Sequence, residues 1–372
     1  MKRLRVGIIG QGRSGRSIHA AHLMALKDKF EIVAVVDPIA IRRESAVRDL
    51  GCEAYEDYKP LLKRKDLDLV VNATPSYLHV PVTLEILKAG HNCLCEKPFA
   101  KTPQEVDKMI AAAKKARKIL AVYQQSRFAP YFTKVMEVIK SGVLGRIVQI
   151  SIAFNGYSRR YDWQTLTSWN GGSLLNTGPH PLDQALRFLD LPLDQMPEVF
   201  CHMDRANTYG DAEDHVKLIM RAPGRPLIDL EISSCAAYPL YTYHVYGTRG
   251  GLKGSTTSAE WKYFKPSECP KLKLTVKPIA KEDGAPAYCS DQIKWHEDKW
   301  EVAPEDRELF HSIGSRFYNM LYDHMVNKKP LLVTPQQVRQ QIAVIQECQR
   351  QNPQIWGKNA KKPAAVKKCA PK

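Results

Sequence analysis

Short apolar runs alternate with amphipathic helical patterns over the first third of the chain. Five of these runs predict buried strands: Leu4 to Ile9, Glu31 to Val36, Leu69 to Asn72, Asn92 to Cys95 and Ile119 to Tyr123. Between the last two, Thr102-Pro103-Gln104-Glu105 predicts a helix start, because it has the spacing of a capping box with proline at the first helical position. Strands that alternate with helices indicate a parallel sheet with crossover helices.

After about residue 145 the pattern changes to period-two alternation, as in Val148, Ile150, Ile152 and Phe154. Such alternation is typical of an antiparallel sheet with one buried face and one wet face. We therefore expect an α/β protein with a doubly wound Rossmann domain at residues 1–124. A substrate-binding and oligomerisation α+β domain with a large open, antiparallel-rich sheet is expected at 125–356, followed by a Lys-rich disordered tail at 357–372.

Composition and charge narrow the function classes. The 372 residues are 44% hydrophobic, enough for two cores without disulfides. The nine cysteines form no C-x-x-C pair, so we expect reduced cysteines and no metal site. We find neither a signal peptide nor an apolar run long enough to span a membrane, and expect a cytoplasmic protein without a membrane partner. The net charge is +16, but six lysines lie in residues 358–372, and no recognition motif indicates nucleic-acid binding.

A nucleotide fingerprint follows the first predicted strand. Gly10-Gln11-Gly12-Arg13-Ser14-Gly15 fits G-x-G-x-x-G and opens a predicted helix, and Asp37 ends the next strand. Glycines let the backbone approach a pyrophosphate, the helix start supplies N–H donors, and the carboxylate binds ribose hydroxyls. An acid at position 37 repels a 2′-phosphate and favours NAD, while Arg42 and Arg43 leave NADP possible.

Two further motifs carry candidate chemistry. Lys97, in Glu96-Lys97-Pro98, follows a parallel strand, where doubly wound folds bind ligands, and its ammonium can stabilise a developing alkoxide. A surface lysine in a turn is the alternative. In the block from Gly171 to Asp183, His180 is a candidate proton acceptor that Asp183 would orient from the same helical face. A purely structural His–Asp pair is the alternative there.

An aromatic and basic stretch precedes that block. Aromatic faces pack on sugar rings and arginines bind carboxylates or phosphates, so the stretch predicts part of a substrate pocket. A loop that covers the core, or a subunit contact, remains an equal alternative. The residues are Tyr157, Arg159, Arg160, Tyr161, Trp163 and Trp169.

The order of the motifs resembles one family over roughly residues 4–350. After the fingerprint come Ala73-Thr74-Pro75 with His79, then Glu96-Lys97-Pro98, Arg127-Phe128 with Pro130, the Gly171 to Asp183 block, and Gly247-Thr248-Arg249-Gly250. This arrangement is similar to the glucose-fructose oxidoreductase, inositol dehydrogenase and rhizopine-catabolism family (Gfo/Idh/MocA). The resemblance implies a Rossmann domain, a C-terminal domain with an open sheet, a bound nicotinamide cofactor and a sugar or cyclitol substrate.

The resemblance also implies residue roles. Lys97 matches the active-site lysine, His180 the proton-transferring histidine and Asp183 the second acid of the block. Further residues are expected at the cofactor: Thr74, Pro75, His79, Glu96 and Gln125. Others are expected at the substrate, in addition to Lys97 and His180: Arg127, Tyr157, Trp163, Trp169 and Asn176. Many sugar-oxidising members carry Asp where this chain has Asn176, which accepts no proton and adds no negative charge beside His180.

These observations predict an NAD(P)-dependent oxidoreductase acting on a secondary alcohol of a sugar, glycoside or cyclitol. Two alternatives stay open: a redox-neutral enzyme that cleaves glycosides through transient oxidation by bound NAD, and a non-enzymatic nucleotide-sensing protein. The uncovered face of an open sheet usually packs against another subunit, so we expect a homodimer or homotetramer.

Overall fold

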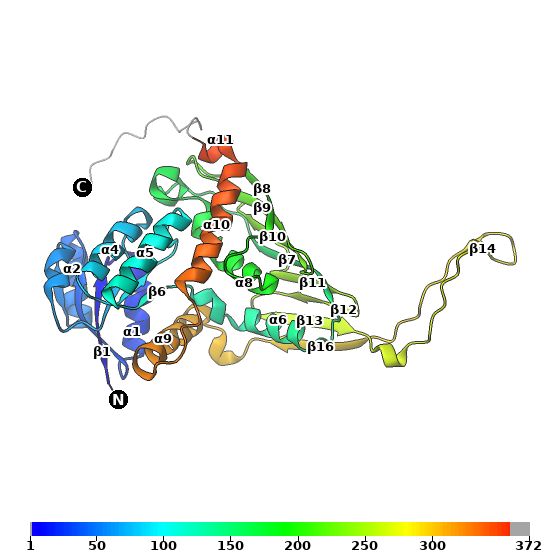
Figure 1. Ribbon diagram of the computed structural model, residues 1–372, viewed down its shortest axis with the longest axis horizontal. Coiled ribbons are helices and arrows are strands. Elements are labelled where there is room, and N and C mark those ends of the chain that lie inside the picture. The colour runs from blue at the N-terminus through cyan, green and yellow to red at the C-terminus, as the bar shows by residue number, and fades with distance from the viewer. Residues whose placement is uncertain (1, 358–372) are drawn as a thin grey trace.

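The computed structural model describes residues 2–357, and its two large sheets lie side by side along the longest axis of the molecule (Figure 1). The predicted tail at 357–372 lies outside the described residues, except for Gly357. In the described part of the chain, no helix is long and apolar enough to cross a lipid bilayer.

The first sheet is parallel, with the strand order β3-β2-β1-β4-β5-β6. Its strands are β1 (Leu4–Ile9), β2 (Phe30–Val36), β3 (Glu53–Tyr55), β4 (Leu69–Asn72), β5 (Cys93–Cys95) and β6 (Leu120–Val122). The connecting helices are η1 (Arg13–Ala20), α1 (Ala21–Ala25), α2 (Ala40–Leu50), α3 (Tyr58–Lys63), η2 (Ser76–Leu78), α4 (His79–Lys88) and α5 (Pro103–Ala116). This is the doubly wound order, in which ligands bind beyond the carboxyl ends of the strands where the order reverses.

The sequence predictions for this sheet are confirmed, and two details were missed. All five predicted strands form, and the Thr102 hydroxyl and the Glu105 carboxylate make the predicted capping box of α5. The short strand β3 was missed because its three residues are half-buried or exposed and so leave no apolar run. The helix of the fingerprint begins as a π-helix, η1, a form that is common at functional sites and that apolar spacing does not reveal.

The second sheet has the order β16-β13-β12-β11-β7-β10-β9-β8. Only β7 and β10 pair in parallel; the other neighbours are antiparallel, as predicted. The strands are β7 (Ile147–Asn155), β8 (Glu198–Asp204), β9 (His215–Arg221), β10 (Leu227–Ser233), β11 (Tyr243–Gly247), β12 (Gly250–Gly254), β13 (Ser258–Tyr263) and β16 (His296–Glu301). The helical segments before and beside it are η3 (Gln125–Phe128), α6 (Pro130–Lys140), η4 (Trp163–Thr165), η5 (Thr167–Trp169), α7 (Ser173–Asn176) and α8 (Pro179–Leu189).

One face of this sheet is buried under helices. Ile150, Leu218 and Leu230 are at most 1% exposed, and α8 packs on β7 and β10 through Leu182 and Leu186. The other face carries polar side chains such as the Lys217–Asp229 ion pair. The alternating pattern along the strands therefore separates a core face from a wet face, as predicted.

The last helices return to the first sheet. These are α9 (Leu309–Asn327), after η7 (Pro304–Asp306), then α10 (Pro335–Gln351) and α11 (Pro353–Trp356). Helix α9 packs on α1 and η3, and α10 packs on α5 and β6. In α9, Tyr318 is fully buried and its hydroxyl lies 2.7 Å from His19 Nδ1. The division at residue 124 stays a prediction, and the packing crosses it.

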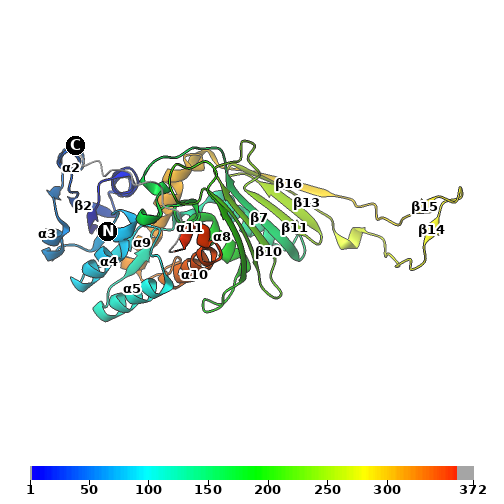
Figure 2. The same cartoon turned by 90° about the horizontal axis from the view of Figure 1, so that it is seen from above.

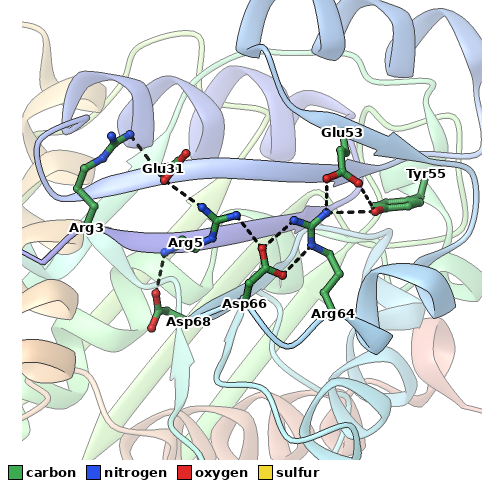
Figure 3. Close-up of polar contacts among 8 residues, drawn as sticks. All are labelled: Arg3, Arg5, Glu31, Glu53, Tyr55, Arg64, Asp66 and Asp68. Carbon is green, nitrogen blue, oxygen red and sulfur yellow. Dashed lines mark hydrogen bonds and ion pairs between the residues drawn. The ribbon is translucent and has the colours of Figure 1, made fainter.

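A network of ion pairs links β1, β2, β3 and the segment before β4 (Figure 3). Arg64 binds Glu53 at 2.6 Å and Asp66 at 2.8 Å, and Arg5 binds Asp66 at 2.7 Å. Hydrogen bonds from Arg64 and Arg5 hold the pKa of Asp66 well below its usual range. Because most of these side chains are exposed, the network adds little stability per pair.

A long excursion, which we call the arm (residues 264–295), connects β13 to β16. It projects away from the body in both views (Figures 1 and 2). It contains η6 (Pro266–Glu268) and a small hairpin of β14 (Ile279–Ala280) and β15 (Pro286–Ala287). The sequence analysis did not anticipate this element.

Candidate active site

The glycine-rich turn after β1 has the shape of a phosphate cradle. Gly10 has φ +97°, and a Cβ there would lie 2.4 Å from the carbonyl oxygen of Ala73. A Cβ at Gly15 would lie 1.8 Å from the oxygen of Gly10, so neither position accepts a side chain. At Gly12 the nearest atom to such a Cβ is 4.0 Å away, so the backbone faces open space. Gly10 and Gly15 therefore shape the turn, and Gly12 leaves it open to a ligand.

The residues around this turn fit a dinucleotide. No side chain caps the start of η1, so its first N–H groups are free to bind an anion. Asp37 is 3% exposed; its carboxylate accepts hydrogen bonds from the backbone N–H of Gln11 at 2.8 Å and of Ile39 at 2.9 Å. Asp37 therefore braces the glycine turn at the end of β2, where a ribose would lie. Arg42 Nη1 is 3.4 Å from the same carboxylate.

His79 joins the loops that follow β4 and β5. Its ring is buried, with Nδ1 2.7 Å from the carbonyl oxygen of Pro98 and Nε2 2.9 Å from that of Thr74. Burial lowers the pKa of His79, so a neutral ring donates to one of these oxygens. The contacts brace Thr74, next to the exposed Pro75, against the segment that carries Lys97. The sequence analysis expected His79 at the cofactor; the structure gives both ring nitrogens main-chain partners.

Lys97 reaches from the end of β5 to the second half of the chain. Its Nζ donates to the main-chain carbonyl of Asn176 at 2.9 Å. Burial lowers the pKa of Lys97; Glu96 opposes this shift, and the positive charges of Arg13 and Arg160 add to it. A lysine ammonium in such surroundings gives up a proton more readily than a solvated one.

Glu96 anchors the backbone of Lys97. Its Oε2 accepts from the Lys97 N–H at 2.9 Å, and its Oε1 lies 3.2 Å from His19 Nε2. Burial alone would raise the pKa of Glu96, but its contact with His19 and the nearby charge of Lys97 bring it down to about 2. The buried carboxylate of Glu96 is thus held at the main chain of Lys97. The sequence analysis expected Glu96 at the cofactor; the structure gives it these protein partners.

His180 stands at the start of α8, near Lys97. Burial and the charge of Lys97 lower the pKa of His180 to about 3, so the ring is neutral at physiological pH. Its Nδ1 is buried without a hydrogen-bond partner among the described residues. The helix start is fixed by Gln124, whose Nε2 donates to the carbonyl oxygen of Pro179 at 2.5 Å, and by a similar bond from Gln341. The structure thus presents a neutral imidazole whose Nδ1 is unpaired.

Asp183 does not contact His180; it pairs with Arg127. Both carboxylate oxygens accept from this guanidinium, with Nε at 2.9 Å from Oδ2. Asp183 is 1% exposed and the Arg127 side chain 11%. Arg127 also donates to the carbonyl oxygen of Leu332 and the side chain of Gln337, so four of its five N–H donors are used. The expected orientation of His180 by Asp183 is therefore replaced by an ion pair between η3 and α8.

Gln125 and Asn176 complete the predicted set near Lys97. Gln125 is 3% exposed, and its Oε1 has no partner among residues 2–357. Asn176 offers its main-chain oxygen to Lys97, while its side-chain Nδ2 donates to Gln164 at 3.3 Å. The contact with Lys97 therefore does not depend on whether residue 176 is Asn or Asp.

The aromatic stretch lies at the rim of this region. Trp169 packs edge to face on Tyr77, with ring centroids 5.1 Å apart, and lies 5.9 Å from Trp163. All three rings are about 40% exposed. Tyr157 is 61% exposed and pairs through its backbone with Cys235 instead. Tyr77 was missed because a single tyrosine after Thr74-Pro75 gives no signal; its contact with Trp169 joins segments 92 residues apart in sequence.

Two cavities flank the loop between β7 and α7. A cavity of about 290 Å³ lies beside Tyr77 and Asn170, between α4 and α5. A smaller one, of about 20 Å³, holds roughly one water and is lined by Arg160, Asn176 and Glu213. The smaller cavity therefore adjoins the residue that holds Lys97.

Glu213 is a second residue that the sequence did not reveal. It is 2% exposed, and its carboxylate accepts from the Leu174 N–H at 2.9 Å and from Trp356 Nε1 at 3.0 Å. A Cβ at Gly172, which has φ +105°, would lie 2.5 Å from this carboxylate. Burial raises the pKa of Glu213 to about 7. Glu213 thus fixes the start of α7, the helix that ends at Asn176, and only the fold brings it there.

Sequence comparisons place this arrangement among known proteins. Residues 4–124 match the model described as "Oxidoreductase family, NAD-binding Rossmann fold", and residues 132–253 match the "GFO/IDH/MocA C-terminal domain". An uncharacterised oxidoreductase of Schizosaccharomyces pombe is 31% identical over 261 residues, 68% of this chain and 70% of that protein. A D-glucoside 3-dehydrogenase of Escherichia coli is 32% identical over 193 residues, 51% of this chain and 55% of its own.

Two further similarities bear on the reaction and the fold. A 2,7-anhydro-N-acetylneuraminate hydratase of Mediterraneibacter gnavus is 27% identical over 263 residues, 68% of this chain and 67% of its own. The crystal structure of GenD2 from gentamicin A biosynthesis, in complex with NAD, has a TM-score of 0.74 at 20% identity and covers 94% of both chains. The Rossmann sheet, the glycine cradle and the two matching domain models agree. The chain belongs to the Gfo/Idh/MocA family of oxidoreductases, and its N-terminal part is an NAD-binding Rossmann fold.

Proposed function

We propose that this protein is an NAD-dependent dehydrogenase that oxidises a secondary alcohol of a sugar, glycoside or cyclitol. One observation links Lys97 to His180 and carries the proposal: Lys97, which follows β5, donates from Nζ to the main-chain oxygen of Asn176 at 2.9 Å, four residues before His180, and its charge lowers the histidine pKa. Both stand beyond the carboxyl end of the parallel sheet, the edge at which doubly wound folds bind their ligands.

The residues divide the work of alcohol oxidation. Bound NAD supplies the acceptor for the hydride that leaves the carbinol carbon. His180, neutral at physiological pH, accepts the hydroxyl proton as the C=O bond forms. Lys97 donates a hydrogen bond to the same oxygen and stabilises its developing negative charge. The ammonium is already held at the Asn176 carbonyl, so little reorganisation precedes the reaction.

The surroundings favour a polyhydroxylated substrate. The exposed rings of Tyr77, Trp163 and Trp169 offer faces for the C–H side of a sugar ring. The D-glucoside 3-dehydrogenase relative is named for the oxidation of such a ring. We extend that substrate class to this chain as part of the proposal.

The test is NADH formation over a panel of sugars, glycosides and cyclitols. On any substrate that reacts, Lys97→Ala should lower kcat by about 10²- to 10⁴-fold, the usual contribution of a positioned proton-transfer group. Lys114→Ala, an exposed lysine of α5 that lines neither cavity, is the matched control and should retain the wild-type kcat. Equal rates for Lys97→Ala and wild type would remove Lys97 from the mechanism.

A redox-neutral reaction is the second candidate, favoured by the similarity to 2,7-anhydro-N-acetylneuraminate hydratase. In that case the hydride taken by NAD returns to the product after elimination, and no net NADH appears. Product analysis with an account of NADH per turnover separates the two. Bond cleavage without NADH supports the second candidate, and one NADH per ketone supports the first.

A further inference from the structure

The arm carries a strand-like run that has no main-chain partner among residues 2–357; its Thr275 Oγ1 accepts a weak side-chain hydrogen bond from Cys289 Sγ at 3.7 Å. Leu272, Leu274 and Val276 alternate with polar positions and are 69%, 90% and 84% exposed. No main-chain hydrogen bond joins residues 270–278 to any other part of the described chain. An extended segment with an apolar face and free N–H and C=O groups is a template for pairing with another strand.

The polar positions of this run are basic. Lys271, Lys273 and Lys277 point away from the apolar face by the period of a strand, and residues 270–281 contain no acid. Within residues 2–357, none of these three lysines forms an ion pair. The run therefore has one apolar side and one positively charged side.

The outer edge of β16 carries the charge opposite to that of the arm run. β16 pairs only with β13, so its other edge is free. Trp300 packs against the core and shares its face of the strand with Asp298, while Glu297, Lys299 and Glu301 lie on the opposite face. These two acids and Asp298 are exposed, and in the described part of the chain none of them forms an ion pair. With three acids and one lysine, residues 297–301 carry a net charge of −2, opposite in sign to that of the arm run.

We propose that residues 271–277 of the arm add as an extra strand to the free edge of β16 in a second copy of this chain, so that two copies exchange arms. In that arrangement Leu272, Leu274 and Val276 lie on the same face of the extended sheet as Trp300. The three lysines lie opposite Glu297 and Glu301, and opposite charges on neighbouring strands stabilise a sheet.

Length and direction favour a second copy as the occupant. Seven extended residues span roughly 23 Å and the six of β16 roughly 20 Å, so the strands match. The arm of each copy leads away from its own β16 (Figures 1 and 2). A two-fold axis that places each arm on the other copy's edge makes both contacts at once, and closes the assembly as a dimer unit. This interface does not depend on the proposed reaction.

The first test measures the mass of the full-length protein in solution at micromolar concentration. Wild type should be a dimer or an assembly of dimers, and Leu274→Asp combined with Val276→Asp should halve the mass. Leu193→Asp, another exposed leucine outside the arm, should leave the mass unchanged. Circular dichroism and NAD binding, unchanged in all variants, show that the body is folded.

The second test exchanges the charges. Lys271→Glu with Lys273→Glu places acid against acid, and Glu297→Lys with Glu301→Lys places base against base, so each variant alone should have the reduced mass. A mixture of the two variants pairs each reversed arm with a reversed edge, and should recover the wild-type mass.

Three outcomes overturn the proposal: a monomeric wild type, which would mean that the arm is free or folds onto its own edge; a mass that the arm variants leave unchanged; or a mixture that does not reassociate. Loss of NADH formation with an intact dimer would instead contradict only the proposed function.

Discussion

Lys97 and Asn176 meet where the two halves of the chain join: the lysine Nζ donates to the main-chain oxygen of Asn176 at 2.9 Å. Because a backbone oxygen accepts this bond, the ammonium keeps its place whichever side chain stands at 176. An Asp at this position, as the family resemblance implied, would add a negative charge; Asn176 omits that charge without releasing the lysine.

Removing the lysine charge should raise the pKa of His180. Burial and Lys97 together hold this pKa at about 3, so Lys97→Met, which keeps an apolar stem, should bring it part of the way back toward 6.5. An NMR titration of the imidazole, assigned by comparison with His180→Gln, measures the shift. An unchanged titration would show that the two groups are not close enough to interact.

Glu213 should make stability depend on pH near neutrality. Its pKa is about 7 in the folded chain and about 4.5 when unfolded, so the folded state binds the extra proton. Stability must then fall as pH rises between these values, by up to about 3 kcal/mol in total.

Glu213→Gln cannot ionise and should lack this contribution. The difference in thermal midpoint between wild type and variant, followed from about pH 5 to about pH 8, should change steadily in favour of the variant. Parallel curves over that range would mean that Glu213 titrates as in the unfolded chain.

The Arg127–Asp183 pair should be essential for stability. Asp183→Asn leaves a buried guanidinium charge without its partner and should lower the free energy of unfolding by about 3 kcal/mol or more. The control, Asp107→Asn, breaks an Arg339–Asp107 pair of the same type whose side chains are 38% and 48% exposed, and should change it by less than about 1 kcal/mol. Urea unfolding compares the two, and equal losses would contradict the distinction.

Asp37, at the end of β2, should make the protein prefer NAD to NADP. Asp37 ends β2, where a Rossmann fold holds the ribose, and its carboxylate would repel a 2′-phosphate, so NAD should bind at least about tenfold more tightly than NADP. Arg42→Ala should weaken the residual NADP binding and leave NAD nearly unchanged, because Arg42 is the cation beside Asp37. Arg48→Ala, on the same helix but 72% exposed at its side chain, is the control. Calorimetric titration with NAD and with NADP measures both affinities. Tighter binding of NADP than of NAD would contradict the predicted cofactor preference.

Local patterns were enough to predict much of this fold. Apolar runs located the parallel strands, and a threonine-led capping box located the start of α5, since these signals lie within a few residues of the element they mark. Lys97 and His180 were found because each sits in a dense motif. Only the fold shows that the Lys97 ammonium reaches Asn176, four residues before His180.

What escaped prediction depends on contacts between distant segments. Asp183 and His180 share a helix, which suggested a pair, but Arg127 lies 56 residues upstream and takes both carboxylate oxygens. Glu213 has an ordinary sequence context, and becomes distinctive only where α7 and Trp356 enclose it. Residues 271–277 of the arm have the pattern of a strand but no main-chain partner among residues 2–357, so the sequence alone does not show with what they pair.

The return of α9 and α10 to the first sheet limits how the molecule moves. The chain crosses between its two halves after β6 and crosses back before α9, and Tyr318 fastens α9 to the fingerprint helix through His19. Opening of the two halves of the chain about a single hinge would have to break these buried contacts. Access to the carboxyl end of the parallel sheet should then depend on local movement of the segments around it, such as the loop that carries Trp169.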